Sequence, residues 1–493
     1  MATQCSGSTR GMMSELRRTF KDVPHAISVN RTDVTLHEAF WRTDADSEDL
    51  KDPSDFLENI ELRDPCYVEW RHNQAKALIQ KRTQANTTES AAQHLALMQL
   101  PGSGAINEGL SIGMRVEGGS SIATELVSTM LASQIGRNMG DQVTARLYDH
   151  TGEAQPNDNH DIGITCHIAE GAQRSTAFLK IIQNADRRVL FVRNIELPTD
   201  AAAAFQNNSL SKTAFLAAEE VLSKLVTQSH LQRPELTAAH LAQVARERIF
   251  SFKPEQLSSA DCLLAQAYEI DANPVLLAWR AFIRNAQFIE ILEGDREQFR
   301  IEATQFVEQA MRAGGNNAQV LSLCAFVTAV MFDECETAME LAFPALESNP
   351  NSAFALQSIA SVQLRNGNLK EAYDYSKRSH SIACYSAIGH WWDLSHSLVC
   401  VATGRLNEAH KLAQTASRKS PHFRPPLRAL LALEAANGDL KAGQITHKRL
   451  ANLEGGFSLD RFLDDPAYPV RTLRNAGLLE FNKTTKDAIR IGA

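Results

Sequence analysis

The chain has 493 residues, of which 44% are hydrophobic and 22% are charged, and its formal net charge at pH 7 is −8. This composition is typical of a soluble globular chain of about three domains, and the acidic balance argues against a nucleic-acid or membrane surface along the whole chain. The eight cysteines include no C-x-x-C pair, which argues against a zinc ribbon or a redox motif and fits a reducing compartment.

The N-terminal part divides into two segments. Residues 1–82 have mixed character and end in a predicted helix around 68–82, whereas residues 83–105 are polar and then rich in Gly and Ser, as linkers are. The first 25 residues lack the apolar core of a secretory signal, and no later stretch approaches the ~20 apolar residues of a membrane-spanning helix. We therefore expect a cytoplasmic protein.

Residues 106–232 have the pattern of a small α/β domain with a trailing helix. Apolar residues recur every three to four positions across 122–137, which predicts an amphipathic helix. The predicted strands are 110–118, 143–149, 161–171, 176–183 and 188–197. Because the last two are joined by the turn sequence NADRR, we expect them to form a hairpin in a mixed sheet.

Residues 233–480 are predicted to be helical and contain a repeated pattern. The segments GNLKEA, GRLNEA and GDLKAG begin at Gly367, Gly404 and Gly438, which are 37 and 34 residues apart. A glycine that ends one helix, followed by a leucine that begins the apolar face of the next, is typical of a helix–turn–helix repeat with this period. We count four or five such repeats between about 255 and 450, enough to share a core.

We find no pattern that predicts catalysis or a cofactor. The chain lacks the H-E-x-x-H, Walker A and G-x-G-x-x-G motifs. The histidines and aspartates around 150–167 match no standard metal spacing, and we interpret residues 152–160 as a polar surface loop. His380, His390 and His396 are interpreted as groove or hairpin-contact residues. The sequence therefore predicts a protein that is not an enzyme and has no cofactor or metal.

The repeats resemble tetratricopeptide (TPR) repeats in their spacing and in their small residues at the helix contacts. That resemblance implies a superhelix with a concave groove, lined by the inward positions of each first helix. Two occupants of the groove remain open: a peptide from a protein partner, or the chain's own tail at 456–480. The groove candidates are Phe354, Gln357, Leu364, Arg365, Trp391, Leu394, Leu398 and Arg428.

A wider resemblance extends over most of the chain. Residues 456–479 (GFSLDRFLDDPAYPVRTLRNAGLL) and 56–71 (FLENIELRDPCYVEWR) resemble segments of bacterial transcriptional regulators in which a winged helix precedes a TPR array. Residues 27–36 resemble the wing hairpin of that DNA-binding domain, and 14–20 resemble the end of its recognition helix. Residues 106–232 are similar to the TolB-N-terminal-like module, which also occurs in TPR-bearing adenylate cyclases, although no cyclase catalytic domain is present here.

This resemblance implies an α+β chain with a winged-helix remnant, a TolB-like domain with a mixed sheet, and an all-α TPR-like superhelix. Only 13 residues precede Ser14, so we expect either a start further upstream or impaired DNA binding. The DNA-contact candidates are Arg17, Arg18, Lys21 and Arg31. We expect a regulatory protein that acts through protein contacts, with an interaction scaffold that does not bind DNA as the alternative; the oligomeric state is open.

Overall fold

The computed structural model describes residues 27–29, 34–36, 109–118, 122–150, 160–170, 175–197, 208–228, 234–291 and 294–491. The chain forms two compact units, Met1–Ala105 and Ile106–Ala493. In the first unit, β1 (Ile27–Val29) pairs antiparallel with β2 (Val34–Leu36). The predictions for 14–20 and 56–71, and the DNA-contact candidates Arg17, Arg18, Lys21 and Arg31, lie outside the described residues.

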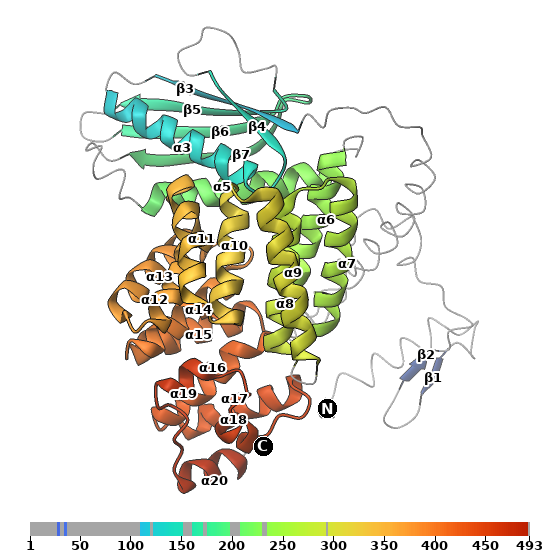
Figure 1. Cartoon of the computed structure of the whole chain (residues 1–493), viewed down its shortest axis with the longest axis vertical. Coiled ribbons are helices and arrows are strands. Elements are labelled where there is room, and N and C mark those ends of the chain that lie inside the picture. Colours follow the sequence, from blue (N-terminus) through green and yellow to red (C-terminus); the bar gives the residue numbers. More distant parts are fainter. Residues whose placement is uncertain are drawn as a thin grey trace. The chain divides into compact units, whose positions relative to one another are not determined.

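The second unit begins with a five-stranded mixed sheet of order β4-β3-β5-β6-β7 (Figure 1). Its strands are β3 (Leu110–Glu117), β4 (Ala145–Asp149), β5 (Ile162–Glu170), β6 (Ser175–Gln183) and β7 (Arg188–Leu197). β3 runs parallel to both β4 and β5, whereas β5, β6 and β7 are antiparallel neighbours. The predicted strands and the predicted mixed sheet are confirmed.

Two helices cover one face of this sheet. They are α3 (Ile122–Gly140) and α5 (Asn208–Gln228). Side chains alternate along β6, so that Leu179 and Ile181 are buried against the helices while Phe178 and Lys180 point to the other face. The core between sheet and helices is mostly aliphatic, and Ile112, Ile164 and Val221 are fully buried in it.

The remainder of the second unit is an array of six antiparallel helix pairs. The pairs are α6 (Pro234–Ile249) with α7 (Pro254–Ile270), α8 (Pro274–Glu290) with α9 (Arg296–Gly314), α10 (Ala318–Val327) with α11 (Cys335–Ser348), α12 (Ala353–Arg365) with α13 (Leu369–Ala383), α14 (Gly389–Ala402) with α15 (Leu406–Lys419), and α16 (Arg424–Ala436) with α17 (Leu440–Leu453). A π-helical turn, η5 (Thr328–Phe332), follows α10. The TPR-like array is confirmed, but it begins earlier than the predicted 255 because α6 and α7 are joined by a turn without the Gly-x-Leu pattern.

Local sequence explains where these helices begin. Pro234, Pro254 and Pro274 occupy first helical positions, where a missing N–H costs no hydrogen bond. The side chains of Asn317 and Ser352 accept hydrogen bonds from backbone N–H groups in the first turns of α10 and α12.

The three repeat glycines end their helices in the same way. Gly367, Gly404 and Gly438 have φ between 73° and 77°, in the left-handed region that L side chains avoid. At Gly404, the Arg405 N–H donates to the carbonyl of Cys400 (2.8 Å) and the Gly404 N–H donates to that of Val401 (3.0 Å). This pair of bonds is the Schellman motif, so the Gly-x-Leu pattern reports a fixed helix ending.

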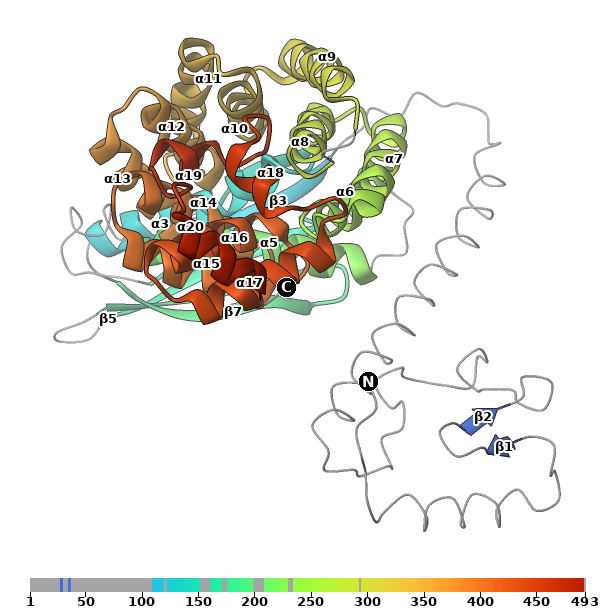
Figure 2. The same ribbon diagram turned by 90° about the horizontal axis from the view of Figure 1, so that it is seen from below.

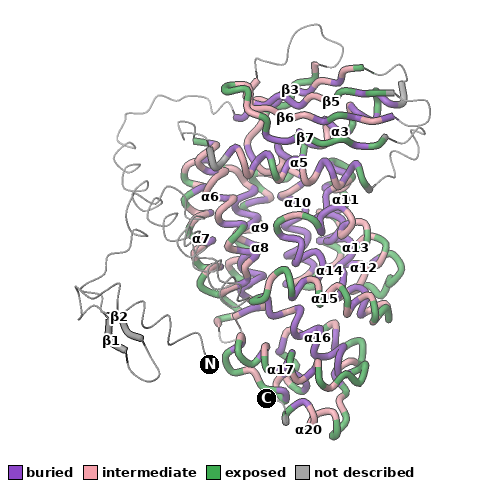
Figure 3. Tube along the Cα trace, turned by 180° about the vertical axis from the view of Figure 1, so that it is seen from behind, coloured by how far each residue is buried: buried purple, intermediate pink, exposed green. Residues whose placement is uncertain are grey.

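The first helix of each pair, here called the inner helix, differs in burial from the second, here called the outer helix (Figure 3). In α9, α11 and α15 the buried positions are small residues, such as Ala303, Ala342 and Ala413. By contrast, almost every residue of α10, α12 and α16 is buried. Alanine lets two helices approach closely, whereas the large side chains of the inner helices fill the space that they enclose.

Three short helices complete the chain: α18 (Leu459–Asp464), α19 (Arg471–Asn475) and α20 (Lys483–Ile491). Helix α19 contacts α14, and Figure 2 shows both inside the arc formed by α6 to α13. Helix α20 packs on α17, where Ile489 is fully buried beside Gly443. No helix among the described residues is long and apolar enough to cross a membrane.

Candidate functional site

The inner helices converge on Trp391. The indole of Trp391 lies 5.4 Å from the rings of Phe326 and Phe354, 5.9 Å from Phe282 and 6.0 Å from Phe250, measured between ring centroids. Each of these five residues comes from a different inner segment, between the end of α6 and α14. Edge-on and tilted contacts at these distances are favourable aromatic packing. The axis of the superhelix is therefore filled by an aromatic core.

The predicted groove residues lie in this packed interior. Trp391 is 6% exposed and Phe354 is 3% exposed, and the side chains of Gln357 and Leu394 are also buried. Leu364 and Leu398 are half-buried, and Leu398 packs against the same core. A peptide could reach Phe354 or Trp391 only by displacing the chain's own aromatic residues.

Arg428, the last groove candidate, belongs to a buried charge cluster. It is 1% exposed and donates to the Glu454 carboxylate at 2.8 Å, while the Tyr468 hydroxyl donates to the same carboxylate at 2.6 Å. Arg424 binds Glu290 in the same way, at 2.7 Å. Burial opposes the charge of Arg428, but Glu290, Tyr468 and Glu454 outweigh it and raise the pKa of Arg428. These charges join α8, α16 and the C-terminal segment.

The C-terminal segment is fixed to the array by further contacts. Asp333, which has φ of 65°, accepts hydrogen bonds from Arg365 (2.7 Å) and from Arg471 (3.2 Å). Arg296 donates to the carbonyl of Ala467 at 3.0 Å. Asp333 is thus shared by Arg365, a predicted groove residue, and by Arg471 of the C-terminal segment.

The histidines separate into unrelated positions. The Nε2 atoms of His150 and His160 lie 2.6 Å apart, and the His160 ring stacks on Tyr148. His390 bonds the carbonyl of Phe250 at 2.7 Å, across the aromatic core. Burial lowers the pKa of His396 to about 3, so this imidazole is neutral at physiological pH. His380 on α13 bonds Asp393 on α14 at 2.8 Å, which is a contact between neighbouring helix pairs.

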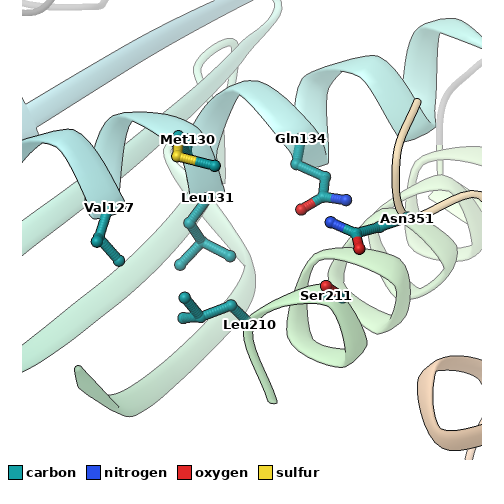
Figure 4. Close-up of a pocket in the computed structure, with 7 residues that line it drawn as sticks. All are labelled: Val127, Met130, Leu131, Gln134, Leu210, Ser211 and Asn351. Carbon is teal, nitrogen blue, oxygen red and sulfur yellow. The ribbon is translucent and has the colours of Figure 1, made fainter. Parts of the chain in front are cut away.

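The seam between the sheet domain and the array is polar. Asn349 donates to Asn138 (2.8 Å) and to Asp141 (3.2 Å), and Asn317 donates to the Asp141 carbonyl. Burial raises the pKa of Asp141 to about 6. A hollow beside this seam has room for about one water molecule, at ≈ 20 Å³, which is far below the several hundred Å³ of a typical ligand pocket (Figure 4).

The sheet face opposite α3 and α5 is not covered by any element that the structure describes. We call it the open face, and its side chains are Arg115, Glu117, His167, Phe178, Lys180, Val189 and Val192. The apolar part is well exposed: Phe178 at 38% and Val192 at 48%. Beside these apolar side chains, the Glu117 carboxylate lies 2.9 Å from both Arg115 and His167, and the three residues form a polar strip. Sequence reasoning did not single out this surface, although the alternation along 176–183 could have indicated it.

The chain was compared with known proteins. No family model and no curated protein matches it. Several solved structures are similar to part of it. PilF of Pseudomonas aeruginosa is 14% identical over 43% of this chain and 97% of that chain, with a TM-score of 0.29. A human IFIT1 dimer with m7Gppp-AAAA is 14% identical over 59% of this chain and 70% of that chain (TM-score 0.38), and a tetratricopeptide repeat protein from Parabacteroides merdae is 13% identical over 57% and 94%, respectively (TM-score 0.31). At these identities and TM-scores the likeness carries no inference about function. The evidence for the TPR-like array is the helix-pair geometry itself.

Proposed function

We propose that the chain is a protein-interaction scaffold that presents the open face of its sheet to a protein partner and catalyses no reaction. The observation that carries this proposal is the exposure of Phe178, Val189 and Val192 on neighbouring strands. Large apolar side chains that cluster on a surface, with charged residues beside them, are typical of protein interfaces.

The helical array supports this function by holding the sheet rigid. Helix α5 packs on the sheet with one side and on α13 with another, and Arg246 on α6 binds Glu219 on α5 at 2.7 Å. The interior of the array is occupied by its own aromatic core, so in this proposal the repeats serve as the support and the sheet as the contact surface. A surface held by packed elements loses little entropy on binding.

The partner is expected to be a protein. The net charge of −8 disfavours the phosphate backbone of nucleic acids, and the open face combines two valines and a phenylalanine with the Arg115–Glu117–His167 strip. Mixed apolar and paired charged groups favour a partner with its own apolar patch and charged rim.

The experiment is affinity purification of the tagged full chain from its source cells, with partners identified by mass spectrometry and verified by reciprocal purification. The Phe178→Glu/Val192→Glu variant should lose the verified partner. Ile445→Glu is the matched control, because Ile445 is 63% exposed on α17, outside the sheet. Equal recovery of the partner with both variants would refute the proposed surface.

A second candidate function is the one implied by the sequence resemblance, a role in transcriptional regulation. The observation that favours it is the β1–β2 hairpin, which occupies the range 27–36 expected for a wing. Its test is a gel-shift and genome-wide binding assay on the full chain with Arg17→Ala/Arg31→Ala as the comparison. Tight, salt-sensitive binding that this variant weakens would support DNA contact, whereas binding unaffected by the variant or absent would refute it.

A further inference from the structure

Three side chains with metal-binding donor atoms meet between α14 and α15. His396 and Cys400 are one turn apart on α14, and Glu408 lies in the first turns of α15. The His396 Nε2 atom is 3.6 Å from the Glu408 carboxylate and 3.8 Å from the Cys400 sulfur, and the three donor atoms all lie within 4.8 Å of one another.

The two separations from His396 are close to the edges of a tetrahedral metal site. With bond lengths of about 2.0 Å to N and O and about 2.3 Å to S, the edges of a zinc tetrahedron are roughly 3.3–3.6 Å long. The two observed distances to His396 need only a few tenths of an ångström of adjustment. Nitrogen, thiolate and carboxylate donors together form a set that Zn²⁺ accepts.

Neighbouring residues orient two of the donors. The Nδ1 atom of His396 is hydrogen-bonded to the Ser376 hydroxyl at 3.0 Å, which leaves Nε2 directed toward Cys400 and Glu408. The Tyr373 hydroxyl donates to the Glu408 carboxylate at 3.2 Å. Metal-binding histidines and carboxylates commonly have such partners, which fix the ligand geometry.

The cluster is open to solvent on one side, which gives an ion a route of entry. His396 and Cys400 are buried, whereas the Glu408 side chain is 42% exposed. An ion can therefore arrive from solvent at the carboxylate and continue to the buried imidazole and sulfur. Two cations act on the same cluster, Arg405 and Lys377, and the charge of a bound thiolate would offset them in part.

We propose that His396, Cys400 and Glu408 bind one Zn²⁺ ion, with the fourth position left to water. On binding, the Cys400 thiol transfers its proton to solvent and its sulfur forms the bond to the metal, so one proton is released for each ion bound. The ion ties α14 to α15 within one repeat. Sequence reasoning expected no metal because the ligands are divided between two helices and follow no standard spacing.

The test uses the full chain, freed of metal with a chelator and titrated with Co²⁺, which reports a thiolate ligand by a charge-transfer absorption band. We expect such a band at one ion per chain, and its loss when Zn²⁺ is added. Cys400→Ser should abolish the band. The matched control is Cys324→Ser, because Cys324 is equally buried but lies on α10, away from the cluster. Absence of the band in the unaltered chain, or its survival in Cys400→Ser, would overturn the proposal.

A second variant covers the case in which Cys400→Ser does not fold. Because Glu408 is partly exposed, Glu408→Gln should leave the circular dichroism spectrum unchanged and weaken Co²⁺ binding about 10-fold or more. Unchanged affinity in a folded Glu408→Gln variant would remove the carboxylate from the site and contradict the proposal.

Discussion

The same substitution at two repeat glycines is expected to have opposite effects. Gly404 lies at the end of α14 with φ of 73°, and no atom lies within 4 Å of an added Cβ. Gly404→Ala therefore destabilises the protein only through the backbone, by about 1–2 kcal/mol for an L residue in the left-handed region. A smaller stabilisation of about 0.4–1 kcal/mol opposes it, because alanine makes the unfolded chain stiffer. We expect a net destabilisation of about 1 kcal/mol.

Gly443 is different because it lies inside α17, where the third repeat has glycine in place of Ala372 and Ala409. A Cβ there would lie 3.7 Å from the side chain of Ile489, an ordinary van der Waals contact. Gly443→Ala should stabilise the protein by about 0.5–1 kcal/mol, because alanine is the better helix former.

The assay is thermal unfolding followed by circular dichroism, with the two variants compared side by side. The melting temperature should fall for Gly404→Ala and rise for Gly443→Ala. Gly404→Asn is a useful third variant because Asn tolerates the left-handed region, and its effect should lie between those of Gly and Ala. A rise in melting temperature for Gly404→Ala, or a clear fall for Gly443→Ala, would refute the reasoning.

Three other substitutions test the interior and the seam. Trp391→Ala should destabilise the fold by about 3–5 kcal/mol in chemical unfolding, since it opens a cavity in the aromatic core; an effect below about 1 kcal/mol would contradict burial. Arg428→Met should cost about 3–5 kcal/mol by leaving Glu454 buried and unpaired, and Arg428→Met/Glu454→Met should recover most of that loss; a double variant as unstable as the sum of the singles would contradict this coupling. The pKa of Asp141 is about 6 in the folded protein, above its ordinary value of 3.8, so the folded protein binds this proton up to a higher pH than the unfolded chain does. The free energy of unfolding should therefore fall as pH rises from about 4 to 6, by at most about 3 kcal/mol. Asp141→Asn should flatten that part of the stability–pH curve, and an unchanged slope would exclude Asp141 as its cause.

Much of the fold could be predicted from local patterns. Short runs of β-type residues and the NADRR turn located the strands of the sheet, and a period of three to four located α3. The Gly-x-Leu pattern located the ends of α12, α14 and α16, because a left-handed residue is a local requirement that one amino acid satisfies. These features depend on residues close together in the chain, and for that reason local sequence patterns are sufficient to predict them.

The closure of the superhelix could not be predicted in the same way. Whether a TPR-like groove is open depends on how tightly the array winds, and that is set by contacts between distant residues. Phe250 meets Trp391 and Glu290 meets Arg424 across more than 130 residues of sequence. Phe354 and Trp391 lie inside the array, but the spacing contained no information on what fills the axis. The His396–Cys400–Glu408 cluster was missed for a related reason, since α14 and α15 each supply only part of it.

The most direct test of the filled interior is the solvent accessibility of its tryptophans. The chain has five, and Trp41→Phe/Trp70→Phe leaves Trp279, Trp391 and Trp392, which are 2%, 6% and 1% exposed. We predict that this variant emits at short wavelength and that acrylamide barely quenches its fluorescence. Long-wavelength emission with strong quenching would show that Trp391 faces solvent in an open groove, and would contradict the account.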